Sequence, residues 1–177
     1  MSEGKLSVPV GPKDHVRGGG ADARITLVEY GDYQCPYCGQ AHPVVQELIR
    51  EFGDDLRFVF RNLPLDSVHP QAMHAAEAAE AVALQGDFWR MHDLLFERQH
   101  DLSDQALVNY AQEAGADLGA LEQALTQHVT IGRIEADLES ALRSGANGTP
   151  AFFVNGTRYD DSWDLDTFSG HLRGLLA

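Results

Sequence analysis

Apolar positions follow a strand pattern near the start of this chain and a helical period just after it. Residues 24–30 are an almost unbroken apolar and β-branched run, which is typical of a strand buried on both faces. Residues 36–52 then carry apolar side chains at helical spacing, and residues 56–61 return to a strand pattern. The pattern therefore predicts a strand, a helix and a second strand in direct succession.

A helical period continues from residue 69 to about residue 144, where alanine and leucine dominate the apolar positions. Gly86, Gly115 and Gly145 stand where helices should end, because glycine readily adopts the left-handed conformation found after a helix C-terminus. The predicted helices cover residues 69–85, 88–98, 103–114, 118–127 and 129–144. We expect them to form a helical block inserted after the second strand.

The chain returns to strands after this block. Residues 151–154 form an apolar run, Asn155-Gly156 is a strong hairpin-turn signal, and residues 157–159 can pair back as a further strand. Residues 165–176 predict a last helix. Strands and helices in this order indicate an α/β fold with a central sheet flanked by helices.

The same patterns divide the chain into an arm, a sheet-containing domain and an insertion. Residues 1–22 are rich in glycine and proline and predict a flexible or loosely docked arm, with a short edge strand at residues 6–10 as the alternative. We assign residues 23–66 and 146–177 to the sheet-containing domain and residues 67–145 to an inserted helical domain.

The composition narrows the choice of partners and location. The chain has 13 Lys and Arg against 27 Asp and Glu, a formal net charge of −14, which disfavours nucleic acid and anionic membranes as partners. No apolar stretch approaches the ~18 residues of a membrane span, and residues 1–17 lack the apolar core of a secretory signal. We therefore expect a cytoplasmic protein, or an extracytoplasmic one if this sequence is a cloned mature fragment.

The two cysteines of the chain, Cys35 and Cys38, stand three positions apart at the start of a predicted helix, which places both sulfurs on one face. So short a loop stabilises a fold little, so the spacing favours a redox-active pair over a structural bridge. Pro36 suits the first helical position and makes Cys35 the N-cap, where the N–H groups of Tyr37 and Cys38 and the helix dipole favour a thiolate. We expect Cys35 to be a partly exposed nucleophile and Cys38 the deeper resolving thiol.

Other side chains near this pair have two interpretations each. Glu29, in the strand before it, is either a buried proton acceptor for Cys38 or a solvent-facing residue on an edge. Tyr33 and Tyr37 flank the pair and form either an apolar rim for a partner or ordinary surface aromatics.

Pro43 should kink the helix. The remaining histidines are interpreted as solvated or packed residues, among them His69, His74, His92 and His100.

A metal site is the weaker interpretation of the same segment. His42 extends the pattern to Cys-x2-Cys-x3-His, but a closed zinc site needs four ligands and the chain has no second cysteine pair. An iron–sulfur cluster shared between two subunits would also use these thiols. We predict no bound metal and no cofactor other than a redox-active disulfide between Cys35 and Cys38.

Four features stand together in residues 23–176: Glu29, the Cys35-Pro36-Tyr37-Cys38 tetrad, the Gly148-Thr149-Pro150 step into a strand, and the helical insertion. Together they resemble the thioredoxin superfamily, specifically its DsbA-like disulfide-oxidoreductase branch. The resemblance implies a thioredoxin-like fold. It also implies that Pro150 is a cis-proline facing the cysteines and that Thr149 offers its backbone to a bound peptide. Pro36, Tyr37 and Tyr33 are then candidate substrate contacts, and Glu29 the buried acid of the family.

The resemblance implies a thiol–disulfide oxidoreductase that acts through Cys35 and Cys38 on protein, peptide or small-molecule disulfides. A reductase or an oxidase would recycle it, with glutathione as one candidate. Tyr37 stands where strongly oxidising relatives carry histidine, so the direction of electron flow stays open. The alternatives are a glutathione-linked transferase, isomerase or peroxidase on the same fold, and a metal-binding or cluster-binding module that uses Cys35, Cys38 and His42.

Overall fold

The computed structural model describes residues 4–177, and each helix and strand predicted from residue 24 onward is present within one helical turn of its expected position. The elements are β1 (His15–Gly18), β2 (Ile25–Gly31), α1 (Pro36–Phe52), a 3-10 turn (Gly53–Asp55), β3 (Leu56–Asn62), α2 (Ala72–Ala83), α3 (Phe88–Glu97), α4 (Asp104–Glu113), α5 (Leu118–Thr126), α6 (Ile131–Arg143), β4 (Ala151–Val154), β5 (Thr157–Tyr159) and α7 (Leu165–Gly174).

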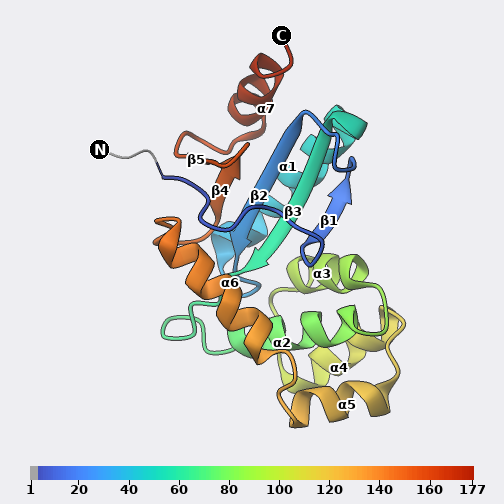
Figure 1. Cartoon of the computed structure of the whole chain (residues 1–177). Coiled ribbons are helices and arrows are strands. Elements are labelled where there is room, and N and C mark those ends of the chain that lie inside the picture. The colour runs from blue at the N-terminus through green and yellow to red at the C-terminus, as the bar shows by residue number, and fades with distance from the viewer. Residues whose placement is uncertain (1–3) are drawn as a thin grey trace. The chain divides into compact units, whose positions relative to one another are not determined.

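The strands form one sheet in the order β1-β3-β2-β4-β5 (Figure 1). β1 is antiparallel to β3, and β4 is antiparallel to both β2 and β5. β2 and β3 are neighbours joined through α1, a crossover typical of parallel strands. The prediction of an α/β fold is confirmed.

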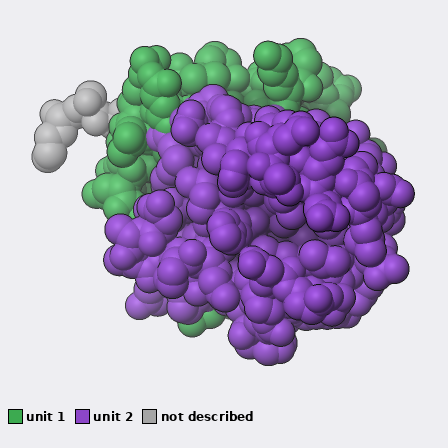
Figure 2. All heavy atoms as spheres, turned by 90° about the horizontal axis from the view of Figure 1, so that it is seen from below, with its two compact units in different colours: residues 1–31, 40–61, 139–177 green, residues 32–39, 62–138 purple. Residues whose placement is uncertain are grey.

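The chain separates into two compact units, coloured in Figure 2. Unit 1 comprises residues 1–31, 40–61 and 139–177 and contains the sheet. Unit 2 comprises residues 32–39 and 62–138 and contains helices α2 to α5. Both cysteines belong to unit 2, since they lie in the short segment 32–39.

In unit 1, α7 packs on the end of the sheet through Phe168, which is fully buried. Its ring stacks on that of Tyr159 with centroids 4.4 Å apart and meets Phe152 edge-on at 5.1 Å. The Ser169 hydroxyl donates to the Glu51 carboxylate near the end of α1 at 2.8 Å. This bond, followed by the pairing with Arg173, holds the pKa of Glu51 below its usual value despite partial burial.

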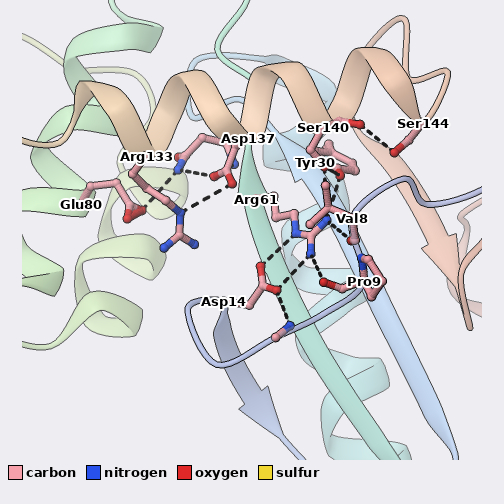
Figure 3. A network of polar contacts seen from close by, with 12 residues as sticks. Val8, Pro9, Asp14, Tyr30, Arg61, Glu80, Arg133, Asp137, Ser140 and Ser144 are labelled. Atoms are coloured by element: carbon pink, nitrogen blue, oxygen red, sulfur yellow. Dashed lines mark hydrogen bonds and ion pairs between the residues drawn. The ribbon is translucent and has the colours of Figure 1, made fainter.

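The N-terminal arm is attached to the sheet by a buried arginine (Figure 3). Arg61 on β3 donates to both carboxylate oxygens of Asp14, at 2.9 and 3.0 Å, and to the carbonyl of Val8 at 2.9 Å. It also donates to the Tyr30 hydroxyl, which bonds with Ser140 of α6. Burial lowers the pKa of the guanidinium, but the bonds with Asp14 and Tyr30 outweigh this and raise it.

The edge strand of the arm differs from its predicted place. It is β1, at His15–Gly18, whereas residues 6–10 contain no strand. Pro9 lacks an N–H to donate to a ladder, and the carbonyls of Val8 and Pro9 accept from Arg61 instead. The arm is docked along residues 4–18, because the N–H of Leu6 also donates to the carbonyl of Gly156 and the N–H of Ser7 donates to the hydroxyl of Ser144. Residues 1–3 of the predicted arm lie outside the described residues.

In unit 2, α2 is the central helix and contacts α3, α4 and α5. Six of its seven alanines are almost fully buried, and their small side chains let the neighbouring helices approach closely. A buried polar cluster lies beside it, where the Asn62 amide donates to Glu80 at 3.2 Å and to Asp137 at 3.0 Å. Burial raises the pKa of Asp137, although the bond from the Asn62 backbone N–H opposes the rise.

Candidate active site

Helix α1 begins at Pro36, and the carbonyl of Cys35 accepts the N–H of Gly39 at 3.1 Å. Cys35 therefore occupies the N-cap position expected from the sequence, and Cys38 lies in the first turn. Neither cysteine is in a disulfide, and 3 % of Cys35 and none of Cys38 is exposed. Cys38 is the deeper of the two, as expected, but the expectation of a partly exposed Cys35 is not met, because the side chains of Asp32 and Gln99 bond with the backbone of its turn.

Asp32 organises the backbone ahead of the helix. Its Oδ1 accepts the N–H groups of Gln34 at 2.8 Å and of Cys35 at 3.2 Å. Its Oδ2 contacts the backbone N–H of Leu65 at 2.9 Å and the Nδ1 of His69 at 2.8 Å. Because the Asp32 side chain is fully buried, these bonds fix the turn that presents Cys35 and tie it to residues 65–69.

Two glutamines complete this frame within unit 2. The Gln99 amide donates to the carbonyls of Tyr33 at 2.9 Å and of Cys35 at 2.7 Å, and the Gln34 side chain accepts the N–H of Gln71 at 2.7 Å. A Cβ at Gly39 would lie 2.4 Å from the Oε1 of Gln99. Glycine at position 39 therefore leaves the room that the Gln99 amide occupies.

The two tyrosines beside the cysteines have different environments. Tyr37 is 62 % exposed on the first turn of α1, which agrees with both of its interpretations. Tyr33 is 1 % exposed; its ring lies 4.9 Å from that of Phe96, and its hydroxyl bonds with the Nδ1 of His92 at 2.9 Å. The suggested role of Tyr33 in an exposed apolar rim is therefore wrong, because packing and its bonded hydroxyl place it in the core of unit 2.

The remaining predicted site residues belong to unit 1. Glu29 on β2 is opposite Phe152 of β4 and only 2 % exposed, which rejects the solvent-facing alternative. The Thr149–Pro150 peptide bond is cis, immediately before β4. His42 is buried within α1, which also contains Pro43.

Sequence reasoning missed the side chains that hold the cysteine turn. Asp32 had a usable signal, because aspartate commonly accepts the N–H groups of the residues that follow it in a turn. Gln99 and His69 had none, since each is far from the cysteines in sequence and only the fold brings it to the turn. The interpretation as a solvated or packed residue is confirmed for His92, which is buried, but it did not include the bonds of His92 with Tyr33 and of His69 with Asp32.

Two features define a thioredoxin-like protein. The chain has a cysteine pair at the N-terminus of a helix that follows a central strand, and it has a cis-proline before β4. The chain belongs to the thioredoxin family, whose model, described as "Thioredoxin", matches residues 12–173. A solved thioredoxin-like oxidoreductase from Silicibacter pomeroyi is 27 % identical and covers 94 % of this chain and 95 % of its own, with a TM-score of 0.81. Oxidised BdbD from Bacillus subtilis is 24 % identical, with a TM-score of 0.80, and covers 98 % of this chain and 97 % of its own. The predicted thioredoxin-like fold and membership of the thioredoxin superfamily are confirmed.

Curated relatives correct the expected location. The Na⁺/H⁺ antiporter NhaA 1 of Salinispora arenicola is 46 % identical over 180 residues, which are 100 % of this chain and 27 % of that protein. The NhaA of Herminiimonas arsenicoxydans is 46 % identical over 168 residues, 94 % of this chain and 26 % of the antiporter. The chain thus spans about a quarter of the length of these relatives. Antiporters are membrane proteins, so the expectation of a cytoplasmic protein is wrong. Within residues 4–177, no helix has the length and apolarity needed to span a bilayer.

Proposed function

We propose that this protein is a thiol–disulfide oxidoreductase that exchanges disulfides through Cys35 and Cys38. The observation that carries the proposal is the position of Cys35 at the N-cap of α1, with Cys38 in the same turn and Asp32 fixing the intervening backbone. Unpaired N–H groups and the positive end of the helix dipole stabilise a thiolate at such a position. The oxidoreductase described for the Silicibacter relative supports the same reaction class.

The reducing reaction has two steps. The Cys35 thiolate attacks one sulfur of the substrate disulfide, which forms a mixed disulfide and releases the other substrate sulfur as a thiolate. Cys38 then loses its proton and attacks the Sγ of Cys35, which forms the Cys35–Cys38 disulfide and releases the second substrate thiolate. The substrate gains two electrons and the protein loses two. The oxidising reaction is the same sequence in reverse.

Within this proposal, Thr149 and Pro150 present the backbone against which a substrate peptide lies, and Pro36 and Tyr37 contact its residues next to the disulfide. The exposed ring of Tyr37 supports that role. The substrates are proteins or peptides that contain a disulfide or a thiol pair, and a separate reductase or oxidase, with glutathione as one candidate, restores the cysteine pair.

Three measurements test the proposal. They are a redox titration against glutathione, turnover of insulin disulfides, and oxidative refolding of a reduced ribonuclease. We expect a reversible two-electron couple assigned to Cys35 and Cys38, with activity in at least one direction. The equilibrium potential decides the direction. Absence of a titratable dithiol, or inactivity in both assays, would reject the proposed function.

Glu29→Gln should slow the second step more than the first. We propose that the buried Glu29 carboxylate accepts the proton of Cys38, and glutamine keeps the shape but cannot accept that proton. We expect resolution of the mixed disulfide to slow by roughly 10²-fold while its formation changes little, as measured by stopped-flow mixing with a fluorescent peptide disulfide. Equal slowing of both steps would contradict this role.

Asp32→Asn should destabilise the protein by about 1–3 kcal/mol, because the amide nitrogen of asparagine is a donor and cannot replace the second accepting oxygen of the carboxylate. Urea unfolding of the reduced protein measures the loss. Asp66→Asn is the matched control, an exposed aspartate next to Leu65 whose replacement should change stability by less than about 0.5 kcal/mol. Equal stabilities of the two variants would show that Asp32 does not hold the turn.

A further inference from the structure

Unit 2 contains a cavity of about 290 Å³ that the proposed disulfide exchange does not use. Its apolar wall includes Leu107 and Val108 of α4 and Leu125 of α5. Helix α2 contributes a carboxylate and an imidazole to the same cavity. An apolar wall with a few polar groups is the usual composition of a small-molecule site, and this volume suits a small ligand.

The polar groups of the cavity form two imidazole–carboxylate pairs. His128 Nδ1 lies 2.8 Å from Glu77 Oε1, and His74 Nδ1 lies 3.4 Å from Asp104 Oδ1. The Glu77 side chain is only 5 % exposed, although it lines the cavity. A carboxylate has acceptor capacity on both oxygens, and the pairing with His128 uses Oε1. Oε2 accepts no hydrogen bond from residues 4–177, so it is available to a ligand that donates.

The backbone at His128 supports a specific use of its side chain. His128 has φ of 50°, a left-handed conformation that usually favours glycine or asparagine. The residue lies between α5 and α6, where a glycine would satisfy the turn without strain. The imidazole instead reaches Glu77 and lines the cavity. His128 thus orients the buried Glu77 carboxylate, although its backbone must adopt the less favourable left-handed conformation to do so.

Charge decides which ligands this cavity favours. Unit 2 carries fourteen Asp and Glu residues against three Arg and no Lys, so it accounts for −11 of the formal charge of −14. Neither Arg nor Lys lines the cavity. Such a field concentrates cations and repels anions. A metal ion fits poorly here, because its ligand atoms must lie close together. Among the described residues, no three of His74, Glu77, Asp104 and His128 bring ligand atoms within 4.8 Å of one another.

We propose that this cavity binds an organic cation, namely a primary ammonium group on a short apolar stem. The ammonium donates to Oε2 of Glu77, and the stem packs against Leu107, Val108 and Leu125. The same chemistry occurs in free amines and in the lysine side chain of a partner protein. The site is separate from the cysteine pair and does not depend on the proposed disulfide exchange.

Methyl NMR of the full-length protein with phenethylammonium as the probe tests the site. We expect saturable shifts at the methyl groups of Val108, Leu125 and Thr126, which line the cavity. The neutral 2-phenylethanol should bind at least about tenfold more weakly because it lacks the charge-assisted bond. Phenylacetate should produce no shifts. Equal binding of the alcohol and the amine would overturn the proposal.

Two variants and a control locate the binding. Glu77→Gln should weaken binding of phenethylammonium at least about tenfold, and Val108→Trp, at a half-buried position, should obstruct the cavity while leaving the carboxylate in place. Glu122→Gln, on an exposed position of α5 outside the lining, should leave binding unchanged. Binding that survives both Glu77→Gln and Val108→Trp would overturn the site.

A second probe separates the two sources of the ammonium group. N-acetyl-lysine methylamide that binds as tightly as phenethylammonium would assign the cavity to a lysine of a partner, and selective binding of the free amine would assign it to a small molecule. Failure of both probes to bind would reject the site. Disulfide turnover should be the same in Glu77→Gln and in the unmodified protein, so this result is independent of the proposed function.

Discussion

Cys35→Ser should abolish disulfide exchange, with a loss of at least about a thousandfold in turnover. The hydroxyl of serine is a far weaker nucleophile than a thiolate at neutral pH, and the N-cap position that stabilises the thiolate does not generate an alkoxide. Turnover of insulin disulfides and single-turnover mixing with a peptide disulfide measure the loss. Circular dichroism and urea unfolding establish that the variant is folded, because Cys35 is buried.

Cys38→Ser is the matched variant for the same assay. It retains the nucleophile, so the mixed disulfide should form and then accumulate, and a reducing agent should release it. Retained turnover in Cys35→Ser would reject the assignment of the nucleophile, and failure of Cys38→Ser to accumulate a mixed disulfide would reject its role as the resolving thiol. Mass spectrometry of the species trapped by Cys38→Ser in cells would identify the substrate.

Arg61→Ala should destabilise the protein by about 3–5 kcal/mol. The guanidinium is buried and bonded with Asp14, Tyr30 and two carbonyls of the arm, and its removal leaves the Asp14 carboxylate without its cation at a site where the side chain is only 10 % exposed. The loss should appear as a lower urea midpoint. Limited proteolysis should also become faster within residues 8–18, since Arg61 holds that segment to β3.

An arginine on the surface provides the control for this loss. Arg50 pairs with Glu47 at 2.9 Å on α1, and its side chain is 73 % exposed, so Arg50→Ala should cost less than about 1 kcal/mol. Asp14→Asn combined with Arg61→Ala should be less destabilising than the sum of the separate changes, because the two residues form one network. Additive losses would show that Arg61 and Asp14 are not energetically coupled.

The sequence determined where the helices and strands of this protein lie, because their apolar periods are strong and local. The ends of α1, β4 and β5 match residues 36–52, 151–154 and 157–159. The same local chemistry placed Cys35 at the start of α1, since proline at position 36 and the spacing of the cysteines act within a few residues.

Only the tertiary structure decided how the cysteine turn is held and how accessible it is. Gln99 reaches the carbonyl of Cys35 from 64 positions away, and His69 reaches Asp32 from 37 positions away. Packing against Phe96 and His92 likewise made Tyr33 a core residue, although the sequence offered it as a surface contact. Hydrophobic period and capping preference depend on neighbours along the chain, whereas burial and long-range hydrogen bonds depend on which distant segments the fold brings together.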